Sequence, residues 1–400
     1  MNFKIKKCVC CESEVKTILD LGSQPLANNL ISDMSESFEE YELKLNLCLS
    51  CYHTQLSLAV DPEKLYKNYF YVSGTSVTLN EEFKRVSKFL KQKTEKQNPK
   101  VLDIASNDGT FLKYFKEIGC DVLGVEPAEN ISKMANEKGI KTLNVFFGTD
   151  KSKIELKDKK FDLITAFNVL AHIPNPLEFM CEMKDLLEKD GIICIQTSQK
   201  DMFYNGEFDT IYHEHHYFYS IKSMCKLASR CGLFLKEITF PKVHGNSYLF
   251  IFSKNEEEDN SEKFILEEKK QGRYSPKLYN SFSNFIEKNK EINNKIISNL
   301  IEEDYYLIGF GAAAKAIVLL NYYDLKIDYI IDENNLKHNK IIPKLNTKII
   351  SMNKCKKIIK NKKTCFVILA WNFADEISRK IKKSFGNVKI ITLMPEFKQL

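Results

Sequence analysis

Histidines concentrate in one stretch of the chain, where they could carry proton transfer. Five of the seven lie between residues 172 and 244, and three of these stand in the run Tyr212-His213-Glu214-His215-His216. Imidazole titrates near neutral pH, so this density beside a carboxylate is typical of general acid–base chemistry. His215 could remove a proton next to a carbonyl, Glu214 could orient and polarise that base, and Tyr212 could hydrogen-bond the oxyanion.

Two other interpretations of the run stay open on the residues alone. His-x-His is a common pair of metal ligands, so the cluster could bind a metal ion. A hydroxyl group would also use a histidine base, so reaction at an oxygen and reaction at a carbon are not separated by the residue types. His172, in a loop expected after an earlier strand, is a further candidate for the same site.

Cysteines form two C-x-x-C pairs near the N-terminus. The pairs are Cys8 with Cys11 and Cys48 with Cys51. Four thiolates at this spacing can surround a zinc ion tetrahedrally, and four protein ligands leave no open position for catalysis. We therefore predict a structural Zn²⁺ site, with Cys10 and His53 as spare donors nearby.

The segment VLDIASNDGTFL predicts a buried strand, a tight turn and a helix. A turn of this kind presents backbone N–H groups to a ligand, but it lacks the G-x-G-x-x-G pattern of a pyrophosphate site. Glu126, at the end of the next strand, could bind the two ribose hydroxyls of an adenosine. S-adenosylmethionine (SAM) fits these features, and the residues predicted to contact it are Asp103, Ala105, Ser106, Asn107, Gly109, Glu126, Phe147 and Asn168.

A second glycine turn lies near the C-terminus. Gly309-Phe-Gly311-Ala312 follows an apolar run and precedes a helix, and Asp332 ends the next strand. Read alone, this pattern resembles a dinucleotide fingerprint and would indicate an NAD-dependent oxidoreductase. With a SAM site earlier in the chain, the same turn and Lys315 are instead expected to bind a nucleotide-linked substrate.

Apolar runs alternate with amphipathic helices in two parts of the chain. This alternation predicts an α/β protein with two Rossmann-like, doubly wound domains preceded by a small zinc-binding domain. We expect a zinc domain at 1–72, a SAM domain at 73–254, a helical connector at 255–302 and a C-terminal nucleotide-sugar domain at 303–400.

The composition limits the class of protein. The net charge of +6 is spread along 400 residues, and no long apolar run or signal peptide is visible. The sequence therefore predicts a cytoplasmic enzyme that binds neither nucleic acid nor membrane. No obligate protein partner is inferred.

An ordered set of motifs resembles the sugar-nucleotide C-methyltransferases that act on 4-keto-6-deoxy sugars. The resemblance runs through the whole chain, and its most specific part is FDTIYHEH. The motifs are LDLGSQPLANNL, DPEKLYKNYFYVSGTS, VLDIASNDGTFL, NVLAHIPN, GEFDTIYHEHHYFYS, GFGAAAKA and AWNFADEI.

The resemblance implies methyl transfer to the carbon of an enolate formed next to the ketone of a nucleotide-linked sugar. It implies His215 as base, accompanied by Glu214, Tyr212 and His172, and a further tyrosine at Tyr71 with Tyr69 as the near alternative. The residues assigned to the substrate are Asn28, Gly311, Ala312, Lys315 and Asp332.

Three segments depart from the family pattern. An expected arginine is missing from His244-Gly-Asn-Ser-Tyr-Leu249, and the acid and proline expected after one strand are replaced by Gln196-Thr197-Ser198. Pro343-Lys-Leu345 stands where Pro-Gly-Thr is usual. These departures leave the sugar and the nucleotide base undetermined.

Overall fold

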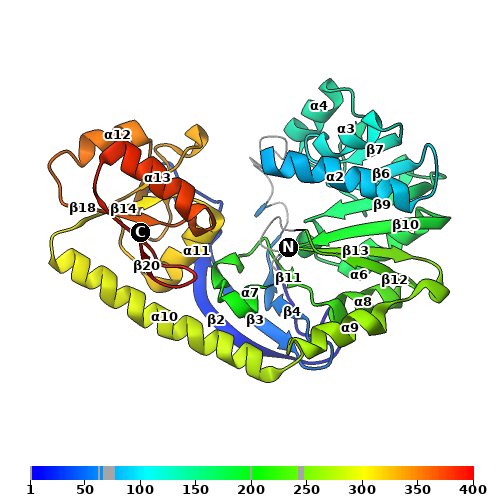
Figure 1. Cartoon of the computed structure of the whole chain (residues 1–400), viewed down its shortest axis with the longest axis horizontal. Helices are drawn as coiled ribbons and strands as arrows, with labels where there is room; N and C mark the ends of the chain where they lie inside the picture. Colours follow the sequence, from blue (N-terminus) through cyan, green and yellow to red (C-terminus); the bar gives the residue numbers. More distant parts are fainter. Residues whose placement is uncertain (1, 62–63, 66–76, 199–200, 242–246) are drawn as a thin grey trace.

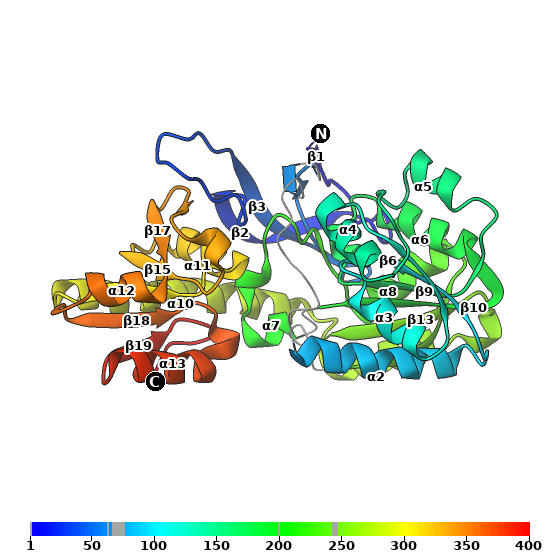
Figure 2. The same cartoon turned by 90° about the horizontal axis from the view of Figure 1, so that it is seen from above.

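The computed structural model describes residues 2–61, 64–65, 77–198, 201–241 and 247–400. Two α/β sheets lie on opposite sides of the molecule, and a long antiparallel sheet from the N-terminal part lies between them (Figure 1). Seen from above, the β2–β3 hairpin projects from this central region (Figure 2).

The N-terminal sheet has the strand order β11-β4-β3-β2. Its strands are β2 (Val15–Pro25), β3 (Glu40–Cys48), β4 (Thr54–Leu56) and β11 (Tyr217–Phe218). A short antiparallel pair, β1 (Phe3–Lys4) with β5 (Leu58–Ala59), lies apart from this sheet. Strand β11 comes from the histidine run more than 150 residues later, so that run is part of the N-terminal sheet.

The first α/β sheet has the strand order β12-β13-β10-β9-β6-β7-β8. Its strands β6 to β10 pair in parallel, and β13 joins β10 antiparallel. Nearly every residue of β9 is buried, as expected for a strand covered on both faces. The strands are β6 (Lys100–Ile104), β7 (Asp121–Val125), β8 (Thr142–Leu143), β9 (Phe161–Phe167), β10 (Leu187–Thr197), β12 (Phe234–Thr239) and β13 (Tyr248–Ser253).

Helices cover both faces of this sheet. Apolar residues of α2 and α3 pack on one face, and those of α6 and α8 pack on the other. Ser220 begins α8 with a capping box, and Asn175 caps α6 ahead of Pro176, so both starts are encoded locally. The helices are α2 (Val77–Lys93), α3 (Thr110–Glu117), α4 (Glu129–Glu137), α5 (Asp150–Glu155), α6 (Pro176–Asp185), α7 (Met202–Asn205) and α8 (Ile221–Arg230).

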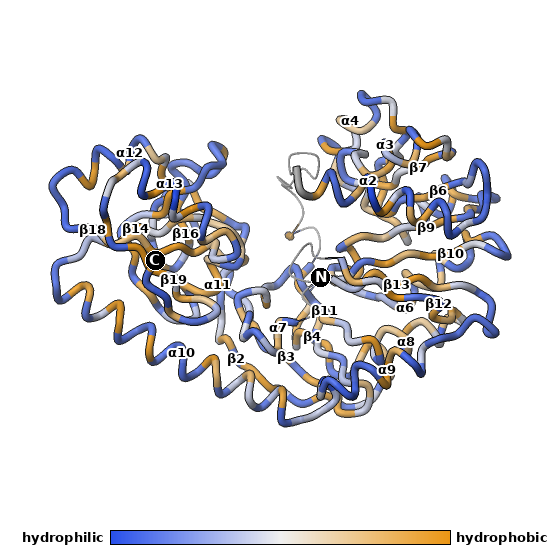
Figure 3. Tube along the Cα trace, in the orientation of Figure 1, coloured by the Kyte–Doolittle hydropathy of each residue, from blue (hydrophilic) through white to orange (hydrophobic). Residues whose placement is uncertain are grey.

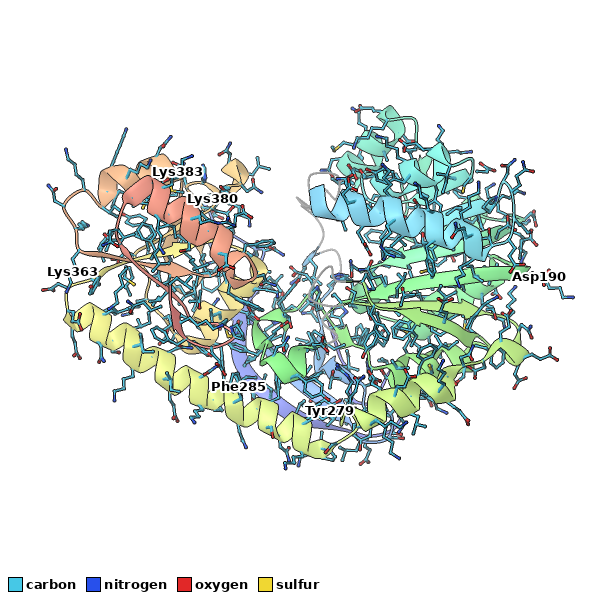
Figure 4. The ribbon with its side chains drawn as sticks, viewed as in Figure 1. Asp190, Tyr279, Phe285, Lys363, Lys380 and Lys383 are labelled. Carbon is cyan, nitrogen blue, oxygen red and sulfur yellow. The ribbon has the colours of Figure 1, made fainter. Side chains whose placement is uncertain are left out.

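Helices α9 (Ser261–Lys270) and α10 (Pro276–Glu302) connect the two α/β units, and α10 runs along the lower edge of the molecule in Figure 1. Tyr279 and Phe285 lie on the inner side of α10, whereas Lys363, Lys380 and Lys383 lie on the outer surface of the C-terminal unit (Figure 4). These two helices lie within the segment expected to be a helical connector, residues 255–302.

The C-terminal sheet has the strand order β16-β17-β15-β14-β18-β19-β20. Helix α11 packs on one face, and α12 and α13 pack on the other. Its elements are β14 (Tyr306–Phe310), α11 (Ala314–Tyr323), β15 (Tyr329–Ile331), β16 (Ile341–Ile342), β17 (Thr347–Ile350), α12 (Met352–Ile358), β18 (Thr364–Ile368), α13 (Ala374–Phe385), β19 (Lys389–Thr392) and β20 (Lys398–Gln399).

Short 3-10 helices occur at several strand ends: η2 (Leu170–His172), η3 (Phe208–Thr210), η4 (Glu256–Glu258), η5 (Asn335–Lys337) and η6 (Trp371–Phe373). The central strands of both α/β sheets are apolar, and α10 alternates between apolar and polar residues (Figure 3).

The predicted fold class is confirmed: two doubly wound α/β units follow a small cysteine-containing unit. Within the described residues, no helix combines the length and apolar character needed to cross a bilayer.

Candidate active site

The four predicted cysteine ligands come together at the N-terminal end of the molecule. The sulfur atoms of Cys8, Cys11, Cys48 and Cys51 all lie within 4.8 Å of one another. The Sγ–Sγ distance is 3.5 Å for Cys8 with Cys51 and for Cys11 with Cys48. Tetrahedral zinc with Zn–S bonds of about 2.3 Å places sulfur atoms about 3.8 Å apart, so the cluster fits a structural Zn²⁺ ion. Cys10 and His53 are buried beside the cluster but are not among its four members.

The turn after β6 has the backbone geometry expected of a ligand-binding loop. Ala105, Asn107 and Gly109 have positive φ values of 56°, 50° and 75°. Glu126, at the end of β7, accepts hydrogen bonds from the backbone N–H groups of Asn107 (3.0 Å) and Ala128 (2.9 Å). The predicted ribose-binding acid thus also fixes the turn, and burial raises its pKa.

Buried polar atoms without a partner gather at the carboxyl edge of this sheet. Among the described residues, Ser106 Oγ, Asn168 Oδ1, Gln196 Nε2 and Thr197 Oγ1 have no hydrogen-bond partner. They follow or end the neighbouring strands β6, β9 and β10. Buried polar groups normally pair, so this edge is suited to a ligand with several polar groups.

Two other residues predicted to contact the cofactor are satisfied within the protein. Asp103 is buried and accepts a hydrogen bond of 2.6 Å from Thr165 Oγ1, and desolvation raises its pKa to about 7. Phe147 is half-buried and contacts Phe179 edge-to-face, with ring centroids 5.1 Å apart. Their predicted contacts with a ligand amine and adenine stay predictions.

His215 is held at both ring nitrogens. Its Nδ1 lies 3.2 Å from the Thr210 carbonyl oxygen, and its Nε2 lies 2.9 Å from the Tyr212 hydroxyl. Because a carbonyl can only accept, Nδ1 carries the proton and Nε2 presents its lone pair to the tyrosine. Desolvation holds the pKa of His215 well below its usual value, and the nearby His172 and Lys315 lower it further. The ring is therefore neutral at pH 7, as a base requires.

His172 lies beside His215, with ring centroids 5.0 Å apart. Its Nδ1 is 2.6 Å from the backbone carbonyl oxygen of Glu214. Desolvation lowers the pKa of His172 to about 4, and the hydrogen bonds to backbone groups at Glu214 and Asn168 oppose that shift.

The carboxylate of Glu214 differs in placement from our expectation. We expected it to orient His215, but its Oε1 accepts a hydrogen bond of 3.0 Å from Asn28 Nδ2, and the Thr210 carbonyl orients the ring instead. Oε2 is buried and has no partner among the described residues. Burial raises the pKa of Glu214 to about 7, and the Asn28 hydrogen bond works against that shift.

The histidine run and the residues flanking it, from Asp209 to Phe218, are attached to all three parts of the molecule. Towards the N-terminal sheet, β11 pairs with β4, and His213 Nε2 donates to the Tyr41 carbonyl oxygen at 3.2 Å. Towards the first α/β unit, the His216 N–H donates to the Ala171 carbonyl oxygen at 2.8 Å. Towards the C-terminal unit, Asp209 accepts a hydrogen bond of 2.7 Å from Trp371 Nε1.

The glycine turn of the C-terminal sheet is satisfied largely from within. Asp332 Oδ2 accepts from the Ala312 N–H and Oδ1 accepts from the Asn334 N–H, both at 2.8 Å. Lys337 Nζ lies 3.7 Å from the same carboxylate and donates to the Ala312 carbonyl oxygen. Lys315, at the start of α11, instead lies over the Trp371 ring, 5.0 Å from its centroid.

Family models match three consecutive parts of the chain. They are a zinc binding domain over residues 8–66, a methyltransferase domain over residues 78–237 and a C-methyltransferase C-terminal domain over residues 242–395. The chain thus carries the zinc-binding, methyltransferase and C-methyltransferase C-terminal domains that these models describe. It is a SAM-dependent methyltransferase with a structural zinc module.

One relative of this C-methyltransferase aligns over its whole length. C-methyltransferase NovU of Streptomyces niveus is 26% identical over 407 residues, which cover 98% of this chain and 96% of the relative. Ubiquinone biosynthesis O-methyltransferase of Actinobacillus pleuropneumoniae serotype 5b is 29% identical over 113 residues, covering 26% of this chain and 47% of that protein. The alignment with this C-methyltransferase thus spans about half the length of that O-methyltransferase.

Structural similarity to solved methyltransferases is limited. The crystal structure of magnesium protoporphyrin IX methyltransferase from Synechocystis PCC 6803 with bound SAM is 12% identical to this chain, with a TM-score of 0.38. The match covers 49% of this C-methyltransferase and 99% of that chain. A score this low carries no inference about the site.

The structure of the C-methyltransferase brings most of the predicted catalytic residues together. His215, Tyr212 and His172 form one cluster, and the Glu214 backbone joins it. Tyr71 and its alternative Tyr69 lie outside the described residues, so their predicted role stays a prediction. Sequence reasoning missed Thr210 because a backbone acceptor leaves no signature in residue type. It also gave Gln196 and Thr197 no cofactor role, although polar residues ending an apolar strand were a usable signal.

Proposed function

We propose that this chain transfers a methyl group from SAM to a carbon next to the ketone of a nucleotide-linked 4-keto-6-deoxy sugar. The observation that carries the proposal is the neutral His215 ring, with its protonated Nδ1 on the Thr210 carbonyl and its Nε2 lone pair beside the Tyr212 hydroxyl. The full-length alignment with a C-methyltransferase favours carbon over oxygen as the acceptor.

His215 acts as the general base in this proposal. Without substrate, the Tyr212 hydroxyl donates to Nε2 at 2.9 Å and covers the lone pair. A substrate C–H group next to the ketone would displace that hydroxyl, and Nε2 would then take the proton. The released Tyr212 hydroxyl would hydrogen-bond the oxygen that gains negative charge in the enolate.

Asn28 and Glu214 would bind the sugar from the side of the N-terminal sheet. Asn28 already donates to Glu214 Oε1, and the buried Oε2 is available to a substrate hydroxyl. Lys315 of the C-terminal unit, whose charge lowers the pKa of His215, would bind the diphosphate, and Gly311 and Ala312 would line the turn beside it. Asp332 would act indirectly, because it holds the Ala312 N–H.

The cofactor would lie along the carboxyl edge of β6, β7 and β9. Glu126 would accept hydrogen bonds from ribose hydroxyls through its remaining lone pairs, and Ser106, Asn168, Gln196 and Thr197 would satisfy their free polar atoms on the ligand. When bound there, SAM supplies an electrophilic methyl group to the enolate carbon.

The wider predictions fit this proposal. We retain the division into residues 1–72, 73–254, 255–302 and 303–400 as the zinc, SAM, connector and nucleotide-sugar segments. We also propose a cytoplasmic location, where the cysteines outside the zinc cluster would stay reduced. His172 would support the base through the Glu214 backbone, and Tyr71 would be a second donor to the enolate.

Solvent deuterium exchange tests the proposal. The protein is incubated in D2O with S-adenosylhomocysteine and a panel of 4-keto-6-deoxy sugars linked to thymidine, cytidine or guanosine diphosphate. The proposal predicts deuterium next to the ketone, above the rate without protein, for at least one of these sugars. His215→Ala should abolish this exchange and should leave SAM binding unchanged.

His213→Gln is the matched control, because a glutamine can still donate to the Tyr41 carbonyl outside the reacting cluster. Exchange in that variant should stay within about threefold of the wild type, because the buried Tyr41 carbonyl keeps its hydrogen-bond donor. A product methylated on oxygen, with no exchange catalysed by the wild type, would overturn the proposal.

A further inference from the structure

Helix η3 (Phe208–Thr210) carries three consecutive groups that face different parts of the molecule. The Phe208 ring packs against Tyr322 and Tyr323 of α11, with both centroid distances at 5.4 Å. The Asp209 carboxylate accepts from Trp371, which also belongs to the C-terminal unit. The Thr210 carbonyl accepts from His215. A single turn therefore separates the C-terminal unit from the proposed base.

The Asp209–Trp371 hydrogen bond joins a fully buried carboxyl group to a half-buried indole. Asp209 is 0% exposed, and its Oδ2 lies 2.7 Å from the indole nitrogen. Lys315 adds a cation over the face of the indole ring. Among the described residues, Asp209 Oδ1 has no hydrogen-bond partner, so the bond from Trp371 to Oδ2 is the side-chain contact that ties this carboxylate to the C-terminal unit. Breaking that bond would leave a buried carboxylate unpaired, which is costly.

We propose that Asp209 and Trp371 are positioning residues: their hydrogen bond fixes η3 against the C-terminal unit, and η3 in turn holds the Thr210 carbonyl that orients the His215 ring. The proposal rests on the proposed function for the role of His215. It adds that the domain expected to bind the nucleotide also sets the geometry of the base.

The direction of the effect follows from the connectivity. Asp209 is covalently next to Thr210, so a shift of the carboxylate moves the Thr210 carbonyl and rotates the imidazole attached to it. Misplacing a reacting group by about 1 Å can slow a reaction about 100-fold. The variants should therefore slow proton removal and should leave cofactor affinity unchanged, because none of these contacts involves the carboxyl edge of β6, β7 and β9.

Fluorescence tests whether the bond exists, independently of any reaction. Trp371 is the only tryptophan in the chain, so all indole emission reports on it. Asp209→Ala should shift the emission maximum, and Asp209→Asn, which keeps an acceptor oxygen, should shift it less. Asp375→Ala removes an exposed carboxylate from the start of α13 and should leave the emission unchanged. Unchanged emission in Asp209→Ala would overturn the proposal.

Deuterium exchange tests the positioning role. With thymidine diphosphate 4-keto-6-deoxyglucose as the probe, or the panel sugar that exchanges in the wild type, Asp209→Ala and Trp371→Phe should slow exchange roughly 10- to 100-fold. Asp209→Asn should recover most of the rate, Asp375→Ala should match the wild type, and SAM affinity should be unchanged throughout.

The two ideas fail in different ways. Wild-type exchange rates in Asp209→Ala and Trp371→Phe, with His215→Ala inactive, would overturn the positioning role and leave the proposed function standing. A parallel loss of SAM affinity would also count against positioning, because it indicates general damage. Absence of exchange in the wild type would instead reject the proposed function, and the fluorescence result would still decide whether the bond forms.

Discussion

The turn after β6 and the glycine turn after β14 share a local design and differ in what remains free around them. In both, an acid at the end of the next strand accepts a hydrogen bond from the turn backbone: Glu126 from Asn107 and Asp332 from Ala312. Around the first turn, Ser106 and three other buried polar side chains lack partners among the described residues. Around the second, Lys337 approaches the acid and donates to the turn carbonyl.

The difference shows that a shared fingerprint does not imply a shared ligand. The first edge has unsatisfied hydrogen-bonding groups that a polar cofactor would pair. The second edge has its own cation bound into the turn, and at that sheet Thr392 is the buried strand-end side chain without a partner among the described residues. The Gly309-Phe-Gly311 turn therefore favours a substrate held through Lys315 over a dinucleotide cofactor.

The largest expected effect distinguishes the proposed base, His215, from Lys315, the cation of the C-terminal unit. His215→Ala should lower kcat by about 10²- to 10⁴-fold, because a positioned general base contributes that much. Lys315→Ala should instead mainly raise KM for the nucleotide sugar, by roughly 10- to 100-fold for a lost charge-assisted contact. Steady-state kinetics with the panel sugar measure both. An equal fall in kcat for the two variants would contradict the assignment of proton removal to His215 and of substrate binding to Lys315.

Two glycine substitutions compare the turns directly. Alanine in place of Gly109 (φ 75°) would put its Cβ 3.1 Å from Ile140, and alanine in place of Gly311 (φ 95°) would put its Cβ 2.7 Å from Ala370. Strain of about 1–3 kcal/mol per site predicts roughly 10- to 100-fold weaker binding of the ligand at each turn. Calorimetry should show that Gly109→Ala weakens SAM and spares thymidine diphosphate, and that Gly311→Ala does the reverse.

Gly386→Ala is the control for these two variants, since its φ is 76° and no atom lies within 4 Å of the added Cβ. It should carry backbone strain without affecting either ligand. Loss of both ligands in Gly109→Ala would contradict the assignment of one ligand to each turn.

A smaller effect concerns pH. The pKa of Glu214 is raised to about 7, so its carboxylate becomes protonated as the pH falls through that value and loses an acceptor for the substrate. We expect kcat/KM to fall about tenfold per pH unit below pH 7. In Glu214→Gln this acid limb should disappear, and the remaining limb should follow His215, whose pKa lies well below its usual value.

Asn28→Ala should shift the acid limb of the rate profile instead of removing it. The Asn28 hydrogen bond lowers the pKa of Glu214, so its loss should move the acid limb to higher pH. Rate profiles from pH 5 to pH 9 measure both variants. A limb near pH 7 that persists in Glu214→Gln would show that another group titrates there.

The smallest effect is expected at the second turn. Lys337→Ala removes the cation beside Asp332, but the pair is partly exposed, with side chains 26% and 13% accessible. Such pairs contribute less than about 1 kcal/mol, so the free energy of unfolding should change little. Denaturant titration measures it. If the variant gained tight NAD binding in calorimetry, the internal cation would be what excludes a dinucleotide.

Local patterns predicted much of the fold. The strands around Val101, Val122, Ile164 and Ile308 were each visible as short apolar runs, and the paired cysteines predicted the sulfur cluster. These features depend on neighbours along the chain, where spacing and periodicity are informative.

Long-range contacts within the site could not be predicted. Strand β11 is two residues long and pairs with β4 from the other end of the chain, so no periodicity marks it. The Glu214 carboxylate pairs with Asn28 and leaves His215 to a backbone carbonyl, and neither partner is encoded by spacing. No local pattern links Trp371 to its acceptor, Asp209, which lies 162 residues earlier in the chain.

The central claim is that the enolate carbon receives the methyl group, and the position of the methyl group in the product tests it most directly. The protein is incubated with [methyl-13C]SAM and the panel of 4-keto-6-deoxy sugar nucleotides, and the product is analysed by 13C NMR. We predict a methyl resonance at the shift of a carbon-bound methyl group, absent with His215→Ala. A methyl resonance at the shift of an oxygen-bound group would contradict the account.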